Sequence, residues 1–395
     1  MDERIGFEIK ESKLKLILPK FIKKNYLEEL NPITEKIKYF KLFRKYRNSS
    51  KELKKESLYS IENLKTEEYM YSIFEAYYLL LTDYMESGVF LFSKKKTNQM
   101  EKGRINWNKT ISKSNLIISG DSLIYSSPYY MNNNILYNHP LTILYGLHLL
   151  EIEKYAGIKM NLDNQYKKII EDNKNTINIK FILDNFKSSM FSDRDRKVFN
   201  ILETIHKSNR NLSKTDSSRS LYYLENINGL WEHMLKNILE DQYDSFKKCF
   251  PEGIYKLNIE GDNYTKAGLR IIPDIIKEFK GKLYIIDAKN YLPHINNNVP
   301  RTADINKQIL YRYFLSKEFN ENNKYNLKDI KNIFLLPSDL QEDLIKKIGV
   351  HRFSNVDSTI GNIDLYQVDF DSVVNSYINN EDDIKEVIFK ELYMD

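Results

Sequence analysis

Two aspartates and a lysine flank a short turn in the last third of the chain. Asp274 lies six residues before the turn at Lys280-Gly281, and Asp287 lies six residues after it. A two-residue hairpin would therefore place the two carboxylates opposite each other, with Cβ atoms about 4.5–5.5 Å apart. Lys289 shares their face because side chains alternate along a strand. Facing carboxylates repel each other, and a divalent cation such as Mg²⁺ would reverse that cost.

This hairpin resembles the core of the PD-(D/E)XK nucleases, since it reads Pro273-Asp274 followed by Asp287-Ala288-Lys289. The resemblance implies that Asp274, Asp287 and the carbonyl group of Ala288 bind Mg²⁺, with Mn²⁺ as a substitute. Lys289, whose pKa desolvation would lower, is expected to orient or deprotonate the attacking water. The alternative is an ordinary strand end with a surface ion pair.

A glutamate precedes the hairpin on a predicted amphipathic helix. Apolar residues recur with helical spacing over residues 230–239, and Glu232 lies at the edge of this stripe. In the nuclease fold a glutamate on this helix often completes the metal shell, so Glu232 is the matching position. Glutamate is also common at the rim of amphipathic helices, which is the alternative reading.

A second helical pattern follows the hairpin. Its spacing places Asp304, Gln308 and Tyr311 on one helical face. Some branches of the nuclease superfamily carry a Gln-x-x-x-Tyr element here, which makes Gln308 a candidate catalytic residue. Tyr311 comes one position too early for that element, with Arg312 at the usual spacing, so its role is left open. Gln308 could instead bridge local polar groups.

Short elements spread over nearly the whole chain share one further resemblance. They are Pro19-Lys20, residues 103–111 (Gly-Arg-Ile-Asn-Trp-Asn-Lys-Thr-Ile), Trp231-Glu232, Pro273-Asp274, Asp287-Ala288-Lys289 and residues 304–308. Together they resemble the LlaJI family of restriction endonucleases, which is related to the McrC nuclease subunit. One departure is Asn290-Tyr291, where aromatic residues are expected at both positions. Within residues 103–111, Trp107 is expected to pack into the core.

The resemblance implies a Mg²⁺-dependent endonuclease of a restriction-modification or modification-dependent restriction system, acting on double-stranded DNA. The chain has no Gly-x-x-x-x-Gly-Lys-Ser/Thr phosphate loop, so a separate McrB-like GTPase motor is an expected partner, and a homodimer is a further assembly to consider. Two other classes stay open: a repair or recombination nuclease, and a catalytically inactive DNA-binding assembly subunit.

Composition agrees with a large enzyme. A chain of 395 residues with 42% hydrophobic content can bury a sizeable core and exceeds the usual size of one domain. No apolar stretch reaches the roughly 18 residues that cross a bilayer, so no membrane association and a cytoplasmic location are expected. The single cysteine, Cys249, cannot form an internal disulfide, and the six histidines show no ligand spacing.

The net charge of +5 does not by itself identify a nucleic-acid-binding protein, but basic residues cluster. Aromatic residues interleave with nine basic residues between Lys36 and Lys55, so the cations could track phosphates while the aromatic rings anchor the stretch or stack on exposed bases. A solvated helix explains this stretch equally well. The candidate DNA contacts are Arg44, Lys45, Arg47, Lys94, Lys95, Lys96 and Arg301.

A polar segment at residues 206–220 predicts a domain boundary. Residues 1–215 are expected to form an N-terminal α+β domain for DNA recognition or partner binding. Residues 216–395 are expected to form an α/β nuclease domain, a mixed β-sheet flanked by helices. The elements expected along the chain are a strand at 9–21, helices at 66–85 and 140–157, a hairpin at 116–126, and strands at 333–337 and 363–368.

Overall fold

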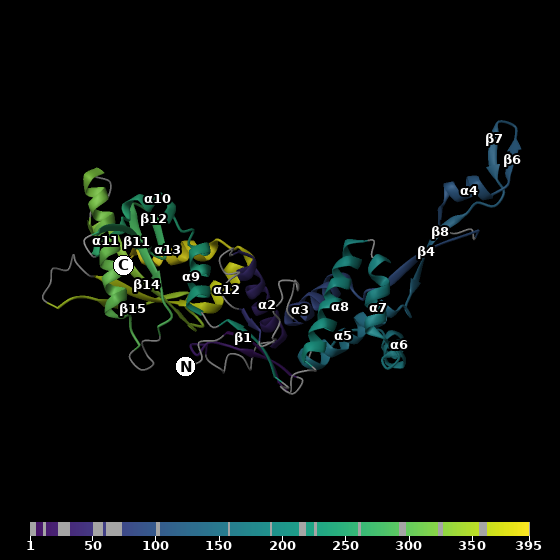
Figure 1. The fold of residues 1–395 in the computed structure, drawn as a ribbon, viewed down its shortest axis with the longest axis horizontal. Helices are drawn as coiled ribbons and strands as arrows, with labels where there is room; N and C mark the ends of the chain where they lie inside the picture. The colour runs from purple at the N-terminus through teal and green to yellow at the C-terminus, as the bar shows by residue number, and fades with distance from the viewer. Residues whose placement is uncertain are drawn as a thin grey trace. The chain divides into compact units, whose positions relative to one another are not determined.

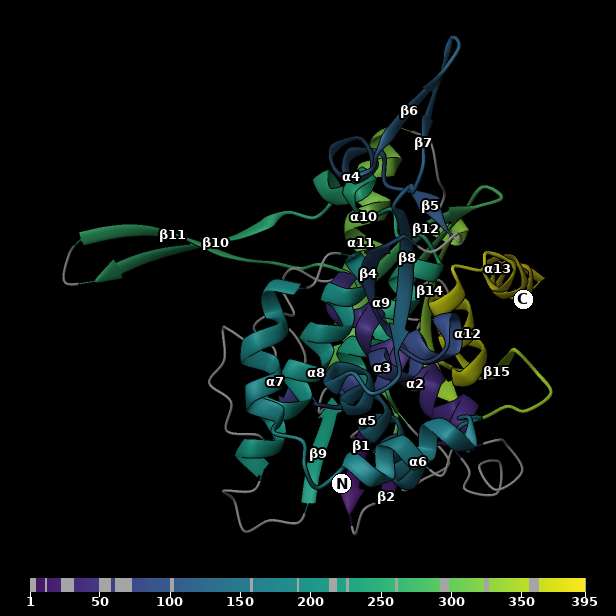
Figure 2. The ribbon, with the colours of Figure 1, turned by 90° about the vertical axis from the view of Figure 1, so that its right-hand side faces the viewer.

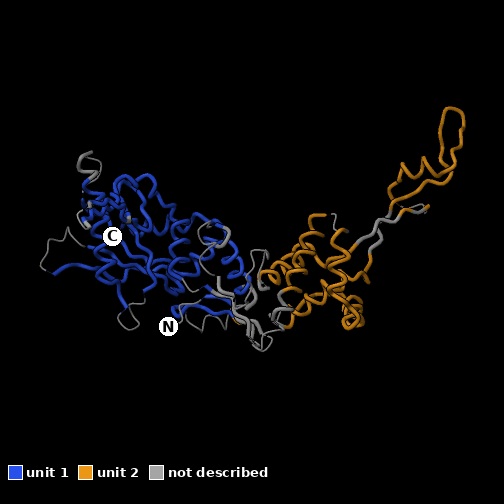
Figure 3. The backbone as a smooth tube through the Cα atoms, in the orientation of Figure 1, with its two compact units in different colours: residues 1–7, 16–59, 221–395 blue, residues 8–15, 60–220 orange. Residues whose placement is uncertain are grey.

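The computed structural model describes residues 5–10, 13–22, 32–49, 58–60, 73–99, 103–156, 159–189, 192–212, 219–224, 227–259, 262–291, 298–322, 327–354 and 362–394. The chain divides into two compact units (Figure 3). Unit 1 comprises residues 1–7, 16–59 and 221–395, and unit 2 comprises residues 8–15 and 60–220.

Unit 1, which contains the labelled strands β12, β14 and β15 in Figure 1, is built on a five-stranded mixed sheet. The strand order is β12-β13-β14-β16-β15. The strands are β12 (Ile275–Phe279), β13 (Lys282–Ala288), β14 (Ile330–Ser338), β15 (Ile345–His351) and β16 (Ile363–Asp369). The central strands β13, β14 and β16 run parallel, whereas the edge strands β12 and β15 run antiparallel to their neighbours. β13 and β14 are apolar along most of their length, as strands buried on both faces must be. The predicted mixed sheet is thus confirmed.

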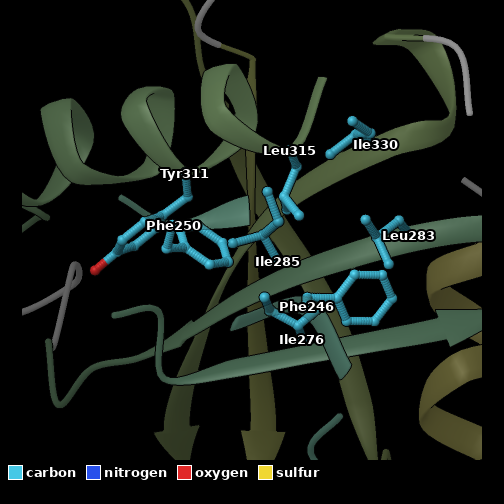
Figure 4. Packing of buried hydrophobic residues seen from close by; sticks show 8 residues of the cluster. All are labelled: Phe246, Phe250, Ile276, Leu283, Ile285, Tyr311, Leu315 and Ile330. Carbon is cyan, nitrogen blue, oxygen red and sulfur yellow. The ribbon is translucent and has the colours of Figure 1, made fainter. Parts of the chain in front are cut away.

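The helices of unit 1 pack on this sheet or on one another. They are α2 (Pro32–Ser49), α9 (Ile227–Ile238), α10 (Tyr243–Phe246), α11 (Thr302–Asn322), α12 (Phe370–Asn379) and α13 (Asp383–Met394), with short 3-10 turns η2 (Lys247–Cys249) and η3 (Leu327–Asp329). α11 forms the crossover from β13 to the parallel strand β14. Its Tyr311 and Leu315 pack on Ile276 and Ile285 of the sheet in one buried cluster (Figure 4). This cluster fixes the helix that follows the candidate catalytic hairpin.

The predicted segment 1–215 does not form one compact unit. Residues 16–59 belong with residues 221–395, because α2 packs on the C-terminal part of the chain. Tyr39 and Phe43 of α2 are each only 1% exposed, and Lys38 forms a 2.6 Å ion pair with Asp371 of α12. These contacts join residues far apart in the sequence, so local composition could not have predicted them.

The turn between β12 and β13 has the two-residue form that the sequence predicts. Lys280 and Gly281 have φ angles of 48° and 75°, the positive values required at both central residues of a type I′ turn. The ladder pairs Phe279 with Lys282 and ends with Ile275 opposite Ile286. Asp274 therefore lies one residue beyond the ladder, directly before β12.

A long two-stranded ribbon precedes this hairpin in unit 1 (Figure 2). It consists of β10 (Glu252–Ile259) and β11 (Asp262–Arg270). Tyr255 and Tyr264 are 60% and 52% exposed, so the ribbon shows aromatic side chains to solvent. The chain passes from the end of β11 to Asp274 through only three residues.

Unit 2 contains a cluster of helices. They are α3 (Ile73–Ser87), α5 (Pro140–Ala156), α6 (Asn164–Asn173), α7 (Ile179–Phe186) and α8 (Asp193–Leu212), with the 3-10 turn η1 (Lys187–Ser189). The helix predicted at 140–157 begins at Pro140 as expected. The helix predicted at 66–85 is described from Ile73, and residues 66–72 lie outside the described part of the chain.

An arm in unit 2 carries residues 103–111. Its elements are β4 (Phe92–Asn98), β5 (Arg104–Ile105), α4 (Trp107–Lys113), β6 (Leu116–Ser119), β7 (Ser122–Tyr125) and β8 (Tyr130–Leu136). The hairpin predicted at 116–126 is confirmed, but the core position predicted for Trp107 is wrong, because its side chain is 55% exposed. α4 is seven residues long and buries only Thr110. The elements of the arm bury too few residues to enclose the indole ring of Trp107.

The remaining strands form a four-stranded sheet in the order β2-β1-β9-β3. They are β1 (Ile5–Lys10), β2 (Lys13–Ile17), β3 (Leu58–Ser60) and β9 (Arg219–Leu224). The single strand predicted at 9–21 is therefore wrong, since two shorter strands occupy this region. The polar segment 206–220 begins inside α8, which continues to Leu212. Among the described residues, no helix combines the length and the apolar character needed to cross a membrane.

Candidate active site

The structure brings Asp274, Asp287 and Lys289 together at one end of the β12–β13 hairpin. Lys289 Nζ lies 2.8 Å from Asp287 Oδ2 and 3.8 Å from Asp274 Oδ2. The backbone N–H of Ala288 donates a 2.9 Å hydrogen bond to Asp274 Oδ2. Asp274 thus reaches across the end of the ladder toward β13. The spacing of residues around the turn had predicted this convergence.

The two carboxylates differ in their surroundings. Asp287 is 3% exposed as a residue, whereas the side chain of Asp274 is 16% exposed. Burial, together with the nearby negative charge of Asp274, raises the pKa of Asp287 to about 7. The repulsion expected for facing carboxylates is therefore present, and the ammonium group of Lys289 offsets part of it.

The electrostatics of Lys289 differ from the expectation. Burial alone would lower the pKa of its ammonium group, but the carboxylates of Asp287 and Asp274 outweigh this effect and raise the pKa to about 12. In this arrangement the two carboxylates favour the charged form of Lys289. The ammonium group is placed to hold negative charge or to orient water, and its role in deprotonating the water stays a prediction.

The donor set fits a hard divalent cation in kind. Asp274 and Asp287 supply two close carboxylates, the usual number for Mg²⁺ in proteins, and the carbonyl group of Ala288 directly follows Asp287 in the sequence. A cation near these carboxylates would relieve the repulsion that raises the pKa of Asp287. Within the described residues, no group of three or more His, Cys, Asp or Glu side chains is placed to hold a metal ion.

Glu232 lies on α9 and faces the same region. Burial and then the negative charge of Asp274 raise the pKa of Glu232, while Lys236 and Lys289 lower it. The two carboxyl groups therefore interact, but Glu232 does not complete a set of three acidic ligands in this structure. Its role as a metal ligand stays a prediction.

Gln308 is completely buried on α11. Neither its Oε1 nor its Nε2 has a hydrogen-bond partner among the described residues, while its backbone carbonyl accepts a 2.9 Å hydrogen bond from Asn332 Nδ2. Buried amides without partners are rare in proteins and need an explanation. The carboxamide has free capacity to bind a water or a ligand, and its catalytic role stays a prediction.

Two tyrosines link α11 to the chain on either side of the hairpin, and neither link was predicted from the sequence. Tyr291 donates a 2.7 Å hydrogen bond to Asp304 Oδ2. Tyr311 donates a 2.8 Å hydrogen bond to the carbonyl oxygen of Ile272. The sequence signal for these links was the helical spacing that places Asp304, Gln308 and Tyr311 on one face. This spacing predicted the correct face but could not identify the residues that it contacts.

Comparison with known proteins decides the family. The family model described as LlaJI restriction endonuclease matches residues 5–389, nearly the full length of the chain. The chain belongs to the LlaJI restriction endonuclease family. Membership indicates a nuclease of a restriction system. No curated protein matches the sequence.

One solved structure similar to this LlaJI-family chain is described as a refined half-complex from a tetradecameric assembly of Thermococcus gammatolerans McrB AAA+ hexamers with bound McrC. The two chains are 13% identical, and the match covers 95% of this chain and 82% of the other. The TM-score is 0.33. A score this low does not establish a shared fold.

In the basic stretch of this LlaJI-family protein, between Lys36 and Lys55, side chains considered for DNA contact are engaged within unit 1. Tyr39, Phe43 and Tyr46 are buried in the core of unit 1, so the prediction that these rings anchor the stretch is confirmed and the alternative, that they stack on bases, is wrong. The ammonium group of Lys45 donates to the carbonyl oxygen of Tyr377 and to Asn380 Oδ1. A phosphate contact by Lys45 would have to break these bonds.

The other predicted DNA contacts of the LlaJI-family protein stay predictions. Arg44 and Arg301 are exposed and accessible to a phosphate. The side chains of Arg47, Lys94, Lys95 and Lys96 lie outside the described part of the structure.

Proposed function

We propose that this LlaJI-family protein is a Mg²⁺-dependent DNA endonuclease of a restriction system, with a PD-(D/E)XK active site at Asp274, Asp287 and Lys289. The observation that carries the proposal is the position of the Lys289 ammonium group, 2.8 Å and 3.8 Å from the two carboxylates at the end of one hairpin. A helix, a hairpin, a crossover helix and a parallel strand surround it in that chain order. Family membership supports the same reading.

Asp274, Asp287 and the Ala288 carbonyl group would hold Mg²⁺, and Mn²⁺ is a chemically similar substitute. When bound, the ion would polarise the scissile phosphate and lower the pKa of water. The Lys289 ammonium group would stabilise the negative charge that builds on the phosphate and orient the attacking water. Water adds to phosphorus and the P–O3′ bond breaks, which leaves a 5′-phosphate and a 3′-hydroxyl end.

Double-stranded DNA is the proposed substrate. Unit 2 is the proposed site of DNA recognition or partner docking, since the candidate catalytic residues all lie in unit 1. The sequence lacks the phosphate loop that would power translocation. We therefore include a separate McrB-like GTPase motor in the proposal.

The test is digestion of methylated and unmethylated plasmid DNA with Mg²⁺, with and without GTP and the products of the neighbouring genes. Cleavage by the wild-type protein and none by Asp287→Asn is the expected result. Cleavage that is equal in the wild type and in Asp287→Asn would overturn the assignment of the site. No cleavage by the wild type on any substrate, together with retained DNA binding, would indicate an inactive assembly subunit. Cutting that ignores methylation but requires DNA ends or gaps would favour a repair nuclease.

A further inference from the structure

α11 contacts the candidate catalytic hairpin on both of its flanks. Tyr311 of α11 donates its hydroxyl to the carbonyl oxygen of Ile272, two residues before Asp274. Asp304 of α11 accepts a hydrogen bond from Tyr291, two residues after Lys289. One helix therefore holds the chain just before the first candidate residue and just after the last one.

The helix itself is fixed firmly enough to serve as this support. Tyr311 is 3% exposed, and its ring packs at 82° against Phe250, with the ring centres 6.0 Å apart. Leu315, one turn further along, is completely buried in the same cluster (Figure 4). Asn332 of β14 donates to the backbone of Gln308 and ties the middle of the helix to the sheet.

The Asp304 end of α11 is also well defined. Asp304 Oδ2 accepts the backbone N–H of Arg301 at 3.1 Å and the Tyr291 hydroxyl at 2.7 Å. A carboxylate in the first turn of a helix is favourably placed against the helix dipole. The helix end therefore fixes the position of Asp304. The hydrogen bond from the Tyr291 hydroxyl then restrains the chain beyond Lys289 relative to Asp304.

The chain just before Asp274 lacks regular strand pairing. Residues 271–273 lie outside both β11 and β12, and the β12–β13 ladder begins only at Ile275. The bond from Tyr311 to Ile272 is thus a tertiary restraint on this segment. Lys289 has a backbone restraint of its own, because its N–H donates to the Leu335 carbonyl oxygen at 3.1 Å. Its long side chain, however, is left to be oriented by its surroundings.

We propose that Tyr311 and Tyr291 are positioning residues with separate tasks. Tyr311 places Asp274 for metal binding, and Tyr291 places the chain that carries Lys289 for the chemical step. The inference rests on the proposed Mg²⁺-dependent cleavage.

The experiment compares Tyr311→Phe and Tyr291→Phe with two controls on α11. Tyr313→Phe removes a hydroxyl from a side chain that is 56% exposed. Leu315→Val weakens the packing of the same helix without touching either hydrogen bond. Mn²⁺ binding is measured by calorimetry without DNA, thermal unfolding is measured without metal, and single-turnover cleavage is measured across a Mn²⁺ titration.

Loss of one hydrogen bond of ordinary strength corresponds to a change of about 2- to 12-fold. Tyr311→Phe should weaken Mn²⁺ binding by about this factor, and its cleavage rate should recover at saturating Mn²⁺. Tyr291→Phe should bind Mn²⁺ as the wild type does but lose about the same factor in the single-turnover rate constant at saturating DNA, with no recovery at high Mn²⁺. Tyr313→Phe should match the wild type, and Leu315→Val should lose stability alone.

If the wild type binds Mn²⁺ and the Mn²⁺ affinities of Tyr311→Phe and Tyr313→Phe do not differ, the inference is overturned while the proposed function stays intact. Equal losses of Mn²⁺ affinity in Tyr311→Phe and Leu315→Val would also overturn it, because the effect would then follow general packing. A wild-type protein that binds no Mn²⁺ and cleaves no DNA would overturn the proposed function and this inference together.

Discussion

The three residues at the end of the hairpin form one electrostatic unit. The buried Asp287, the more open Asp274 and the cationic Lys289 share a single compact site. The positive charge of Lys289 is stabilised by the same carboxylates whose mutual repulsion it reduces. A change at any one of them therefore alters the charge balance of the other two, and the effects of substitutions separate only if metal binding and rate are measured independently.

Asp287→Asn should abolish both Mn²⁺ binding and cleavage while preserving the fold. The amide keeps the size of the carboxylate but removes its charge, and the metal contributes several kcal/mol to phosphoryl transfer, so the loss of rate should be about 10²-fold or more. Calorimetry with Mn²⁺ and single-turnover plasmid cleavage provide the two measurements. Cutting at the wild-type rate by Asp287→Asn would contradict the role of this residue.

Lys289→Ala should leave metal binding in place and lower the rate. Removing one preorganised charge-stabilising group typically costs about 10²- to 10³-fold in kcat. The same two measurements, made at saturating Mn²⁺, check this division of roles. A loss of Mn²⁺ affinity as large as that of Asp287→Asn would show that Lys289 supports the metal site instead.

At the scale of elements, α3 and α8 of unit 2 are joined by a buried ion pair. Arg194 donates from Nε and from a terminal guanidinium nitrogen to the two oxygens of Asp83, at 3.2 and 3.0 Å. Tyr145 of α5 donates to the same carboxylate at 3.0 Å. Asp83 is 2% exposed, so these hydrogen bonds replace the water that would otherwise solvate its carboxylate.

Arg194→Met should therefore destabilise unit 2 by about 3 kcal/mol, because it leaves a buried carboxylate without its cation. The matched control is Arg196→Met, which breaks the exposed pair with Asp193 and should change stability by less than about 0.5 kcal/mol. Urea unfolding of both variants measures the difference. If both variants lose a similar free energy of unfolding, burial does not determine how much the Asp83–Arg194 ion pair contributes to stability.

His139, just before α5, gives unit 2 a dependence on pH. Burial lowers the pKa of His139 to about 4. Its Nδ1 accepts the backbone N–H of Leu141 at 3.3 Å, and its ring stacks on Phe92 with the centres 3.9 Å apart. The folded protein therefore keeps this imidazole neutral at pH values where the unfolded chain protonates it.

Between about pH 6.5 and pH 4 the unfolded state binds one more proton at His139 than the folded state, so the free energy of unfolding falls as the pH falls. The stability that comes from burying a neutral His139 is fully present above the pKa of this histidine in the unfolded chain. Urea unfolding of the wild type and of His139→Phe across this range measures it. The variant should show a shallower pH dependence, and equal slopes would exclude His139 as the cause.

At the scale of the whole molecule, the chain leaves unit 1 for unit 2 twice, at residues 8–15 and 60–220, and returns each time. Residues 16–59 complete unit 1, although about 160 residues of unit 2 separate them from the rest of it. The buried aromatic face of α2 and the ion pair of Lys38 with Asp371 show what this segment contributes. Unit 1 is therefore discontinuous in sequence.

A fragment of residues 216–395 should fail to fold stably, because it lacks α2 and would expose the surface that Tyr39 and Phe43 cover. A chain in which a short Gly/Ser linker replaces residues 61–218 keeps both parts of unit 1, and it should fold and bind Mn²⁺ while losing sequence discrimination. Circular dichroism, thermal unfolding and Mn²⁺ calorimetry compare the two. A cooperative transition in the 216–395 fragment, with wild-type Mn²⁺ affinity, would show that α2 is dispensable.

The sequence by itself determined the candidate catalytic hairpin, because that hairpin depends on local rules. The turn at Lys280-Gly281 and the period of two along a strand were enough to bring Asp274, Asp287 and Lys289 together. The helices that begin near Pro140 and Thr302 likewise carry their signals in their own residues. For these elements, pattern and structure agree.

Only the tertiary structure decided which surfaces are buried and which side chains meet across long separations. Lys45 and Tyr377, 332 residues apart, meet because α2 packs on α12, and Trp107 stays exposed because its arm lacks a second layer. The bond from Tyr311 to Ile272 spans 39 residues. Periodicity can place a residue on a helix face, but its partner is selected by the packing of the whole unit.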